Sequence, residues 1–128
     1  MNPYSAIINI TNLRLRTFIG FNPEEQEKQQ DIIINAEIHY PAEEACEEDN
    51  VAQALNYKNV TKKMIAHIEN GRFKLLEKLV KDALDICAEH SSVSFAKVTI
   101  DKPHALRFAD SVSLTLQYAN PNTLKEAS

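Results

Sequence analysis

The sequence has little glycine and no long apolar segment. Only two glycines and five prolines occur among 128 residues, which favours long regular elements over a fold built from loops. No segment approaches the roughly 18 consecutive apolar residues that a membrane-spanning helix needs. The first residues also lack a basic region followed by an apolar core and a cleavage site. We therefore expect a soluble, cytoplasmic protein of ordinary globular composition.

Cysteine and histidine are sparse, and basic residues are dispersed. The two cysteines, Cys46 and Cys87, lack the C-x-x-C spacing, so we expect both to be reduced and without a chemical role. The sequence contains neither a phosphate-binding glycine loop nor a zinc motif, and its four histidines are scattered, so we expect no metal site. The net charge is −4, and Lys and Arg never occur in runs longer than two, which argues against nucleic acid as a partner.

Hydrophobic periodicity predicts four strands and two helices. Apolar and polar residues alternate, as in β-strands, over residues 7–19, 31–40, 95–101 and 111–118. Between the second and third of these segments, residues 57–70 show helical spacing and end before Gly71, a residue favoured at helix ends. A second apolar stripe with helical spacing runs from Phe73 to Cys87. We expect the polar segment 21–30 and the acidic segment 43–49 to form loops or single helical turns.

The order β-β-α-α-β-β is typical of an α+β domain. We expect a four-stranded antiparallel sheet with two helices on one face. The length fits a single domain over residues 1–119, followed by a polar tail at 120–128. A four-stranded sheet has two free edges, and such edges tend to pair with other chains. We therefore expect copies of the chain to associate edge to edge.

Three residues stand out as candidates for chemistry. Glu77 lies at the edge of an otherwise apolar helix stripe, which fits either an ion pair with Lys81, four residues further on, or a functional carboxylate. Lys102 stands at the end of the third predicted strand, where functional side chains are frequent, although a solvated lysine fits equally. Tyr57 begins the first predicted helix and, without further context, is interpreted as a packing residue.

Four segments carry a resemblance to a known family. They are LRLRTFIG at residues 13–20, ALNYKNVTK at 54–62, RFKLLEKL at 72–79 and KPHALRFADSVS at 102–113. Together they resemble the dihydroneopterin aldolase and epimerase family, from about residue 7 to residue 118. The resemblance implies the tunnelling fold, in which β-β-α-α-β-β subunits join their sheets into an oligomeric barrel. Two tetrameric rings of this kind then stack as a homo-octamer.

The resemblance also implies a pterin site between neighbouring subunits. Glu77 matches the helix glutamate that hydrogen-bonds the pterin. Lys102 matches the catalytic lysine that precedes a proline, and Tyr57 matches an active-site tyrosine. Glu25 matches a loop glutamate five residues after the glycine that ends the first strand. A shift of one residue in the alignment would assign this role to Glu24 instead.

The family's chemistry is consistent with these residue types. A retro-aldol step breaks the C1'–C2' bond, and the dihydropterin's own C6=N5 imine accepts the electrons, so neither a cofactor nor a lysine Schiff base is required. Lys102 would transfer a proton at the 2'-hydroxyl, directly or through a water. Tyr57 would hold that water or shuttle the proton, and Glu25 would orient the lysine or the substrate side chain.

Four cationic residues are candidates for holding a triphosphate. They are Arg14, Arg16, His104 and Arg107, in segments that look like the epimerase branch of the family. The leading expectation is therefore cofactor-free epimerisation at C2' of 7,8-dihydroneopterin triphosphate to 7,8-dihydromonapterin triphosphate. The alternative is an aldolase of folate biosynthesis that releases glycolaldehyde and 6-hydroxymethyl-7,8-dihydropterin. A non-catalytic pterin-binding ring protein is the second alternative, against which the presence of all four matching site residues argues.

Overall fold

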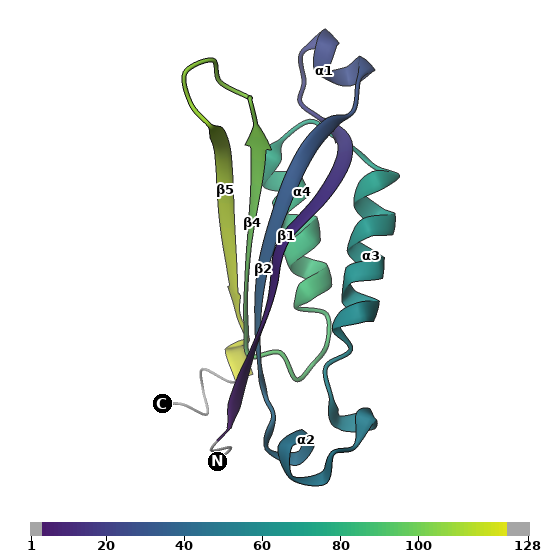
Figure 1. Ribbon diagram of the computed structural model, residues 1–128, viewed down its shortest axis with the longest axis vertical. Helices are drawn as coiled ribbons and strands as arrows, with labels where there is room; N and C mark the ends of the chain where they lie inside the picture. The colour runs from purple at the N-terminus through teal and green to yellow at the C-terminus, as the bar shows by residue number, and fades with distance from the viewer. Residues whose placement is uncertain (1–3, 123–128) are drawn as a thin grey trace.

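The computed structural model describes residues 4–122 and has an α+β fold, as predicted (Figure 1). A curled sheet carries two long helices, α3 and α4, on one face (Figure 1). The elements in chain order are β1 (Ser5–Ile19), α1 (Pro23–Glu27), β2 (Gln30–Pro41), α2 (Glu43–Glu48), the 3-10 turn η1 (Val51–Gln53), α3 (Tyr57–Glu69), β3 (Arg72–Phe73), α4 (Leu76–Cys87), β4 (Phe95–Pro103) and β5 (Ser111–Ala119). Within these residues, no helix is long and apolar enough to cross a membrane.

All four predicted strands and both predicted helices are present, with bounds close to those expected. The two segments expected to be loops or helical turns contain the short helices α1 and α2. Of the polar tail predicted at 120–128, residues 123–128 lie outside the described part of the chain. The alternation of apolar and polar residues therefore identified the main elements correctly.

The predicted four-stranded, fully antiparallel sheet is wrong in one respect. The sheet has five strands in the order β3-β1-β2-β4-β5, and β3 runs parallel to β1. Phe73 was predicted to begin the apolar stripe of the second helix, but it lies in β3 and α4 begins only at Leu76. The end of β1 has backbone groups that need partners, and β3 supplies them: the Gly20 amide donates to the Phe73 carbonyl at 2.9 Å.

A β-bulge in β1 changes which side chains face the helices. Ile10 pairs with Ala36 of β2, whereas Leu13 pairs with Ile34, so β1 contains one extra residue between these pairs. Asn12 in the bulge has a positive φ of 55°, and its backbone amide donates to the side-chain oxygen of Asn35. After the bulge, every second residue of β1 from position 13 to position 19 faces the core.

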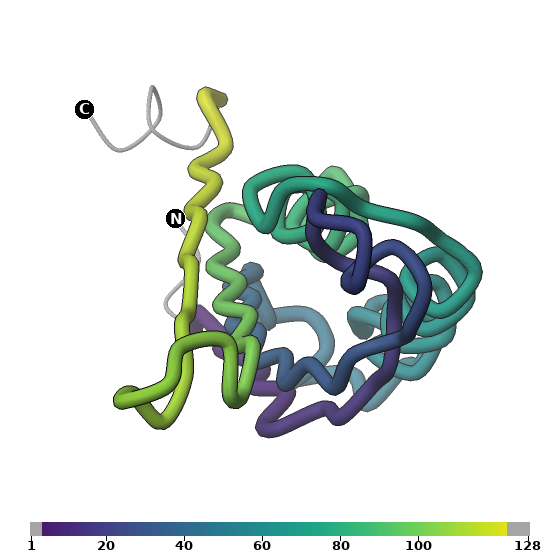
Figure 2. Tube along the Cα trace, turned by 90° about the horizontal axis from the view of Figure 1, so that it is seen from above, coloured from purple at the N-terminus to yellow at the C-terminus, as the bar shows by residue number. Residues whose placement is uncertain are grey.

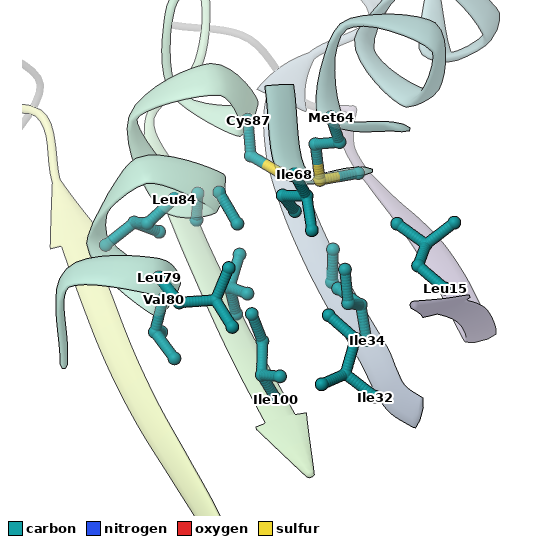
Figure 3. Packing of buried hydrophobic residues seen from close by; sticks show 14 of the residues in the cluster. Leu15, Ile32, Ile34, Met64, Ile68, Leu79, Val80, Leu84, Cys87 and Ile100 are labelled. Atoms are coloured by element: carbon teal, nitrogen blue, oxygen red, sulfur yellow. Dashed lines mark hydrogen bonds between the residues drawn. The ribbon is translucent and has the colours of Figure 1, made fainter. Parts of the chain in front are cut away.

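The core lies between the sheet and the two long helices (Figure 3). It is formed by aliphatic side chains from β1, β2 and β4 on one side and from α3 and α4 on the other, including Leu15, Ile32, Ile34, Met64, Ile68, Leu79, Val80, Leu84, Cys87 and Ile100. The hydroxyl of Thr17 is also fully buried, and it donates to the Ile68 carbonyl at 2.6 Å. This bond satisfies the buried hydroxyl and joins the end of α3 to β1.

The chain direction brings several element ends together at one end of the molecule. β1 and β4 both end there, next to α1, β3 and the start of α4 (Figure 1). Viewed from above, α1 lies close to the connection between α3 and α4, and the β4–β5 connection projects away from both helices (Figure 2). α3 begins at the opposite end of the molecule, beside α2 (Figure 1). Most of the predicted site residues therefore lie at the end that carries α1.

Candidate active site

An ion pair between Glu25 and Lys102 is the centre of the candidate site. The Lys102 Nζ donates to the Glu25 Oε2 at 2.9 Å, although the two residues are 77 positions apart in the sequence. The side chain of Glu25 is only 24% exposed, and that of Lys102 only 14%. The side-chain amide of Gln30, at the start of β2, donates to the same carboxylate oxygen at 3.4 Å. It is thus Glu25, and not the exposed Glu24, whose carboxylate contacts the lysine.

The local sequence explains how Glu25 reaches this position. Gly20 ends β1 with a φ of +133°, a conformation that glycine adopts without the steric cost of a side chain. The Asn22 side chain accepts a hydrogen bond from the Glu25 amide at 2.9 Å and so caps α1. Pro23 occupies the start of the helix, where its missing N–H has no intrahelical partner to lose. The helix therefore starts next to the end of β1 and directs Glu25 toward β4.

The electrostatics of the pair favour an ionised carboxylate. The hydrogen bond from Lys102 is the main cause that lowers the pKa of Glu25 below its usual value. Partial burial opposes this effect, while the charge of Lys102 and the hydrogen bond from Gln30 reinforce it. Glu25 is therefore a negatively charged group that holds the lysine amine in a defined place at neutral pH.

A hollow of about 340 Å³ lies beside Glu25. Its lining comes from the end of β1, from α1 and from the segment that includes β3, namely Phe18, Gly20, Glu25, Gln26, Arg72, Phe73 and Lys74. A cavity of this size can take part of a small organic ligand. The hollow therefore offers apolar surface from Phe18 and Phe73 next to an ionised carboxylate.

Three of the four predicted triphosphate ligands border a second hollow, of about 490 Å³. Arg14, Arg16 and His104 contribute to its lining. The Arg16 guanidinium also contacts Asp31 at 3.0 Å, so part of its charge is already compensated. Within residues 4–122, Arg107 is not among the residues that line this hollow, and its guanidinium lies 5.4 Å from the ring centroid of Phe108. Arg14, Arg16 and His104 thus share a hollow that Arg107 does not line.

Glu77 lies in the first turn of α4 and is exposed. Of the two interpretations of Glu77, the ion pair with Lys81 is not formed, because the Lys81 amine instead contacts Asp85 at 2.6 Å. Lys81 has an acidic residue four positions away on each side, and its amine lies against the later one, Asp85. Among the described residues, no ion pair of Glu77 is found.

Tyr57 is not brought together with Glu25 and Lys102 within one chain. It is the first residue of α3, which begins at the end of the molecule opposite α1 (Figure 1). At 1.5 Å per residue, the length of α3 alone places about 18 Å between the two ends of this helix. Tyr57 is 51% exposed. The single chain therefore holds the carboxylate and the lysine of the predicted site in contact, but not the tyrosine.

Sequence reasoning missed two contributors to the site, Gln30 and Arg72. Gln30 hydrogen-bonds Glu25, but in the sequence it only ends a polar segment and has no distinguishing pattern. Arg72 donates from Nη1 to the Gln26 carbonyl of α1 at 3.1 Å, across 46 positions of sequence. In the described part of the chain, no group of three His, Cys, Asp or Glu side chains is arranged to hold a metal ion.

The fold is shared with solved structures of known proteins. A curled sheet with two helices on one face is shared with the dihydroneopterin aldolase of Escherichia coli, whose crystal structure in complex with neopterin matches with a TM-score of 0.83. That match covers 89% of this chain and 99% of that chain at 24% sequence identity. The chain thus has the fold of pterin aldolases, with a carboxylate–lysine pair beside a small-molecule hollow.

The sequence comparisons identify the family. The model of the dihydroneopterin aldolase family matches residues 8–117, and the chain belongs to this family. A dihydroneopterin triphosphate 2'-epimerase of Escherichia coli K12 is 59% identical over 114 residues, which are 89% of this chain and 95% of that protein. An epimerase of the same description from Pseudomonas aeruginosa is 49% identical over 91% of this chain and 94% of that protein.

Proposed function

We propose that this protein is a dihydroneopterin triphosphate 2'-epimerase, an isomerase that inverts C2' of 7,8-dihydroneopterin triphosphate. The contact between Glu25 and Lys102 carries the proposal, since it places a lysine amine at a partly buried carboxylate beside a hollow. This contact would serve an aldolase as well. The much higher sequence identity to an epimerase than to the dihydroneopterin aldolase of Escherichia coli K12, 59% against 26%, favours inversion over release of the fragment.

The proposed reaction begins with loss of the proton from the 2'-hydroxyl. The C1'–C2' bond then breaks, C2' becomes the carbonyl carbon of a two-carbon aldehyde, and the bonding electrons move into the C6=N5 imine of the dihydropterin. Re-addition of the fragment to C1' through the opposite face of the aldehyde restores the bond with C2' inverted. Lys102 in its neutral amine form would accept this proton, directly or through a water, and return it to the 2'-oxygen after re-addition, while Glu25 keeps the amine in place.

The pterin would bind through Glu77, with Tyr57 supplied by another copy of the chain. Both side chains are exposed in the single chain, and Tyr57 lies at the far end from Lys102. β5 is the last strand of the sheet, so its outer edge can pair with another subunit. A homo-octamer of two stacked rings with sites between subunits is the assembly that we propose.

The triphosphate would be held by Arg14, Arg16 and His104, which border one hollow. Arg14 is expected to contribute more than Arg16, because Asp31 already neutralises part of the Arg16 charge. Arg14→Ala should raise KM for the triphosphate about tenfold and leave KM for unphosphorylated dihydroneopterin unchanged. Arg107→Ala is the comparison variant, and an equal or larger rise in this variant would transfer the phosphate contact to Arg107.

The deciding experiment compares two substrates. Purified protein is incubated with 7,8-dihydroneopterin triphosphate or with 7,8-dihydroneopterin, and the pterins are oxidised, dephosphorylated and separated by chromatography. Monapterin formed mainly from the triphosphate is the expected result. Mainly 6-hydroxymethylpterin from the unphosphorylated substrate would identify an aldolase, and no turnover of either would favour a pterin-binding protein. Lys102→Ala and Glu77→Ala should both lose turnover, whereas Lys97→Ala on the same strand as Lys102 should keep it.

A mixing experiment tests the shared site. Tyr57→Phe and Lys102→Ala are each expected to be nearly inactive alone. If a site combines Lys102 of one copy with Tyr57 of another, co-assembled variants should regain activity, because some interfaces then contain both native residues. Mixed octamers that stay inactive, with assembly verified by light scattering, would show that both residues act from the same chain. Full activity of Tyr57→Phe alone would show that Tyr57 has no role.

A further inference from the structure

Helix α1 carries Glu25 but has little to hold it in place by itself. It is five residues long and contains no buried residue. Helices this short are unstable in isolation, so their position depends on contacts with the rest of the protein. The Asn22 cap acts within the segment itself and does not connect α1 to the sheet. The position of Glu25 therefore depends on bonds from distant parts of the chain.

Arg72 supplies such a bond. Its Nη1 donates to the Gln26 carbonyl at 3.1 Å, and Gln26 follows Glu25 directly. The central carbon of the Arg72 guanidinium lies 3.8 Å from the centroid of the Phe18 ring, close enough for a cation–π interaction. Arg72 pairs with Phe18 in the parallel ladder between β3 and β1. The backbone of Arg72 is thus paired with the sheet and the face of its guanidinium lies on Phe18. The edge of the guanidinium donates to α1.

We infer that Arg72 is a positioning residue for the reaction, which holds α1 so that the Glu25 carboxylate meets the Lys102 amine. The effect of Arg72 on turnover rests on the proposed function, whereas its effect on the position of α1 does not. The planar guanidinium can stack on Phe18 and donate in its own plane at the same time, which an ammonium group cannot do. Arg72 is exposed, so these two contacts do not follow from burial of the side chain in the core.

The test uses three variants of the full chain. Arg72→Gln removes the charge and the stacking, Arg72→Lys keeps the charge but not the planar group, and Lys74→Gln removes a different positive charge that borders the same hollow. Both Arg72 variants should lower kcat about tenfold or more with a smaller change in KM. Lys74→Gln should lower kcat less than either, since no hydrogen bond to α1 is lost. Thermal unfolding of each variant checks that the fold is retained.

The ionisation of Glu25 gives a readout that does not need turnover. The charged groups around Glu25 are Lys102 of β4, Arg72 and Lys74 at the hollow, and Glu24 and Glu27 on α1 itself. If α1 loosens, the carboxylate loses contact with Lys102, and its pKa rises toward the ordinary value. NMR titration of the Glu25 side-chain carboxyl should therefore show a larger upward shift in Arg72→Gln and Arg72→Lys than in Lys74→Gln.

The outcomes separate the two proposals. Equal shifts in Arg72→Gln and Lys74→Gln would reduce Arg72 to a general source of positive charge, and an unchanged Glu25 titration in both Arg72 variants would overturn the positioning role. Rescue of kcat and titration by Arg72→Lys would also contradict it, because charge alone would then suffice. Wild-type protein that fails to epimerise the triphosphate would refute the proposed function, yet the titration would still decide whether Arg72 positions Glu25.

Discussion

The carboxylate of Glu25 lies against the α-carbon of Gly20, in the space that a side chain at position 20 would occupy. Gly20 also has a positive φ of 133°, so the turn requires glycine both for its backbone conformation and for its lack of a side chain. These two residues are five positions apart in the sequence, and the turn between them brings α1 back over the end of β1. The absence of a side chain at position 20 is therefore a condition for the contact between Glu25 and Lys102.

Gly20→Ala should impair both stability and turnover. The new methyl group would overlap the Glu25 carboxylate, and the positive φ would strain any residue other than glycine. Such strain costs about 1–3 kcal/mol of unfolding free energy. Urea denaturation measures this loss, and steady-state kinetics should show a fall in kcat. Gly71→Ala serves as comparison for overlap without the positive φ, because its new methyl group would meet the Phe73 ring at a glycine for which no positive φ is found. Full activity in Gly20→Ala would contradict the need for this close contact.

Glu25→Gln should reduce kcat about a hundredfold, whereas Glu24→Gln should have little effect. Only the Glu25 carboxylate contacts Lys102, and Glu24 is exposed in the first turn of α1. The two variants change the net charge of the same helix equally, so a difference between them reports position and not charge. The measurement is kcat with the triphosphate substrate. Equal losses in both variants would show that the acidic charge of α1 matters and not the contact with Lys102.

The contribution of the Glu25–Lys102 pair to stability should depend on pH. The folded protein holds the pKa of Glu25 below its usual value of 4.5, mainly through the hydrogen bond from Lys102. A carboxyl group whose pKa is lowered by folding stabilises the fold above its unfolded pKa, and this contribution is lost as the pH falls through the folded pKa. Lys102→Met removes the effect. Its stability deficit relative to wild type should be present near neutral pH and should shrink once the pH falls below about 4.5.

The size of this contribution is about 1 kcal/mol or less, because both side chains remain in partial contact with water. Urea denaturation of wild type and Lys102→Met at about pH 7 and about pH 3 measures it, at one protein concentration because association of subunits also stabilises the fold. A deficit that is the same at both pH values would assign the loss to packing of the lysine side chain and not to the ion pair.

The two cysteines should differ sharply in reactivity. Both are free thiols, and Cys46 is exposed while Cys87 is buried in the core beside Met64. Burial raises the pKa of Cys87 to about 12, so almost none of it is thiolate at neutral pH. A thiol reagent should therefore label Cys46 in the native protein and both cysteines only after denaturation. Rapid labelling of Cys87 in the native state would indicate that α4 separates from the sheet.

Local sequence patterns were sufficient for the main elements and insufficient for the pieces that join them. The alternation over residues 31–40 identifies β2 because each side chain on one face is buried and its neighbour is not. β3 has only two residues, which cannot show a period, and Phe73 looked like part of a helix stripe because an apolar residue near a helix start has no local mark of its conformation. The Glu77–Lys81 pair failed for a similar reason, because Asp85 offers Lys81 the same spacing.

By itself, the sequence determined the α+β class, the strands and helices, and through family resemblance the roles expected for Glu25, Tyr57, Glu77 and Lys102. The tertiary structure decided which of these groups meet. It brings Glu25 and Lys102 into contact across 77 positions, uses Arg72 to hold α1, and leaves Tyr57 at the other end of the molecule. Spacing along one element is a local property, whereas a contact between α1 and the end of β4 depends on strand order, the β3 ladder and the direction of every connection between them.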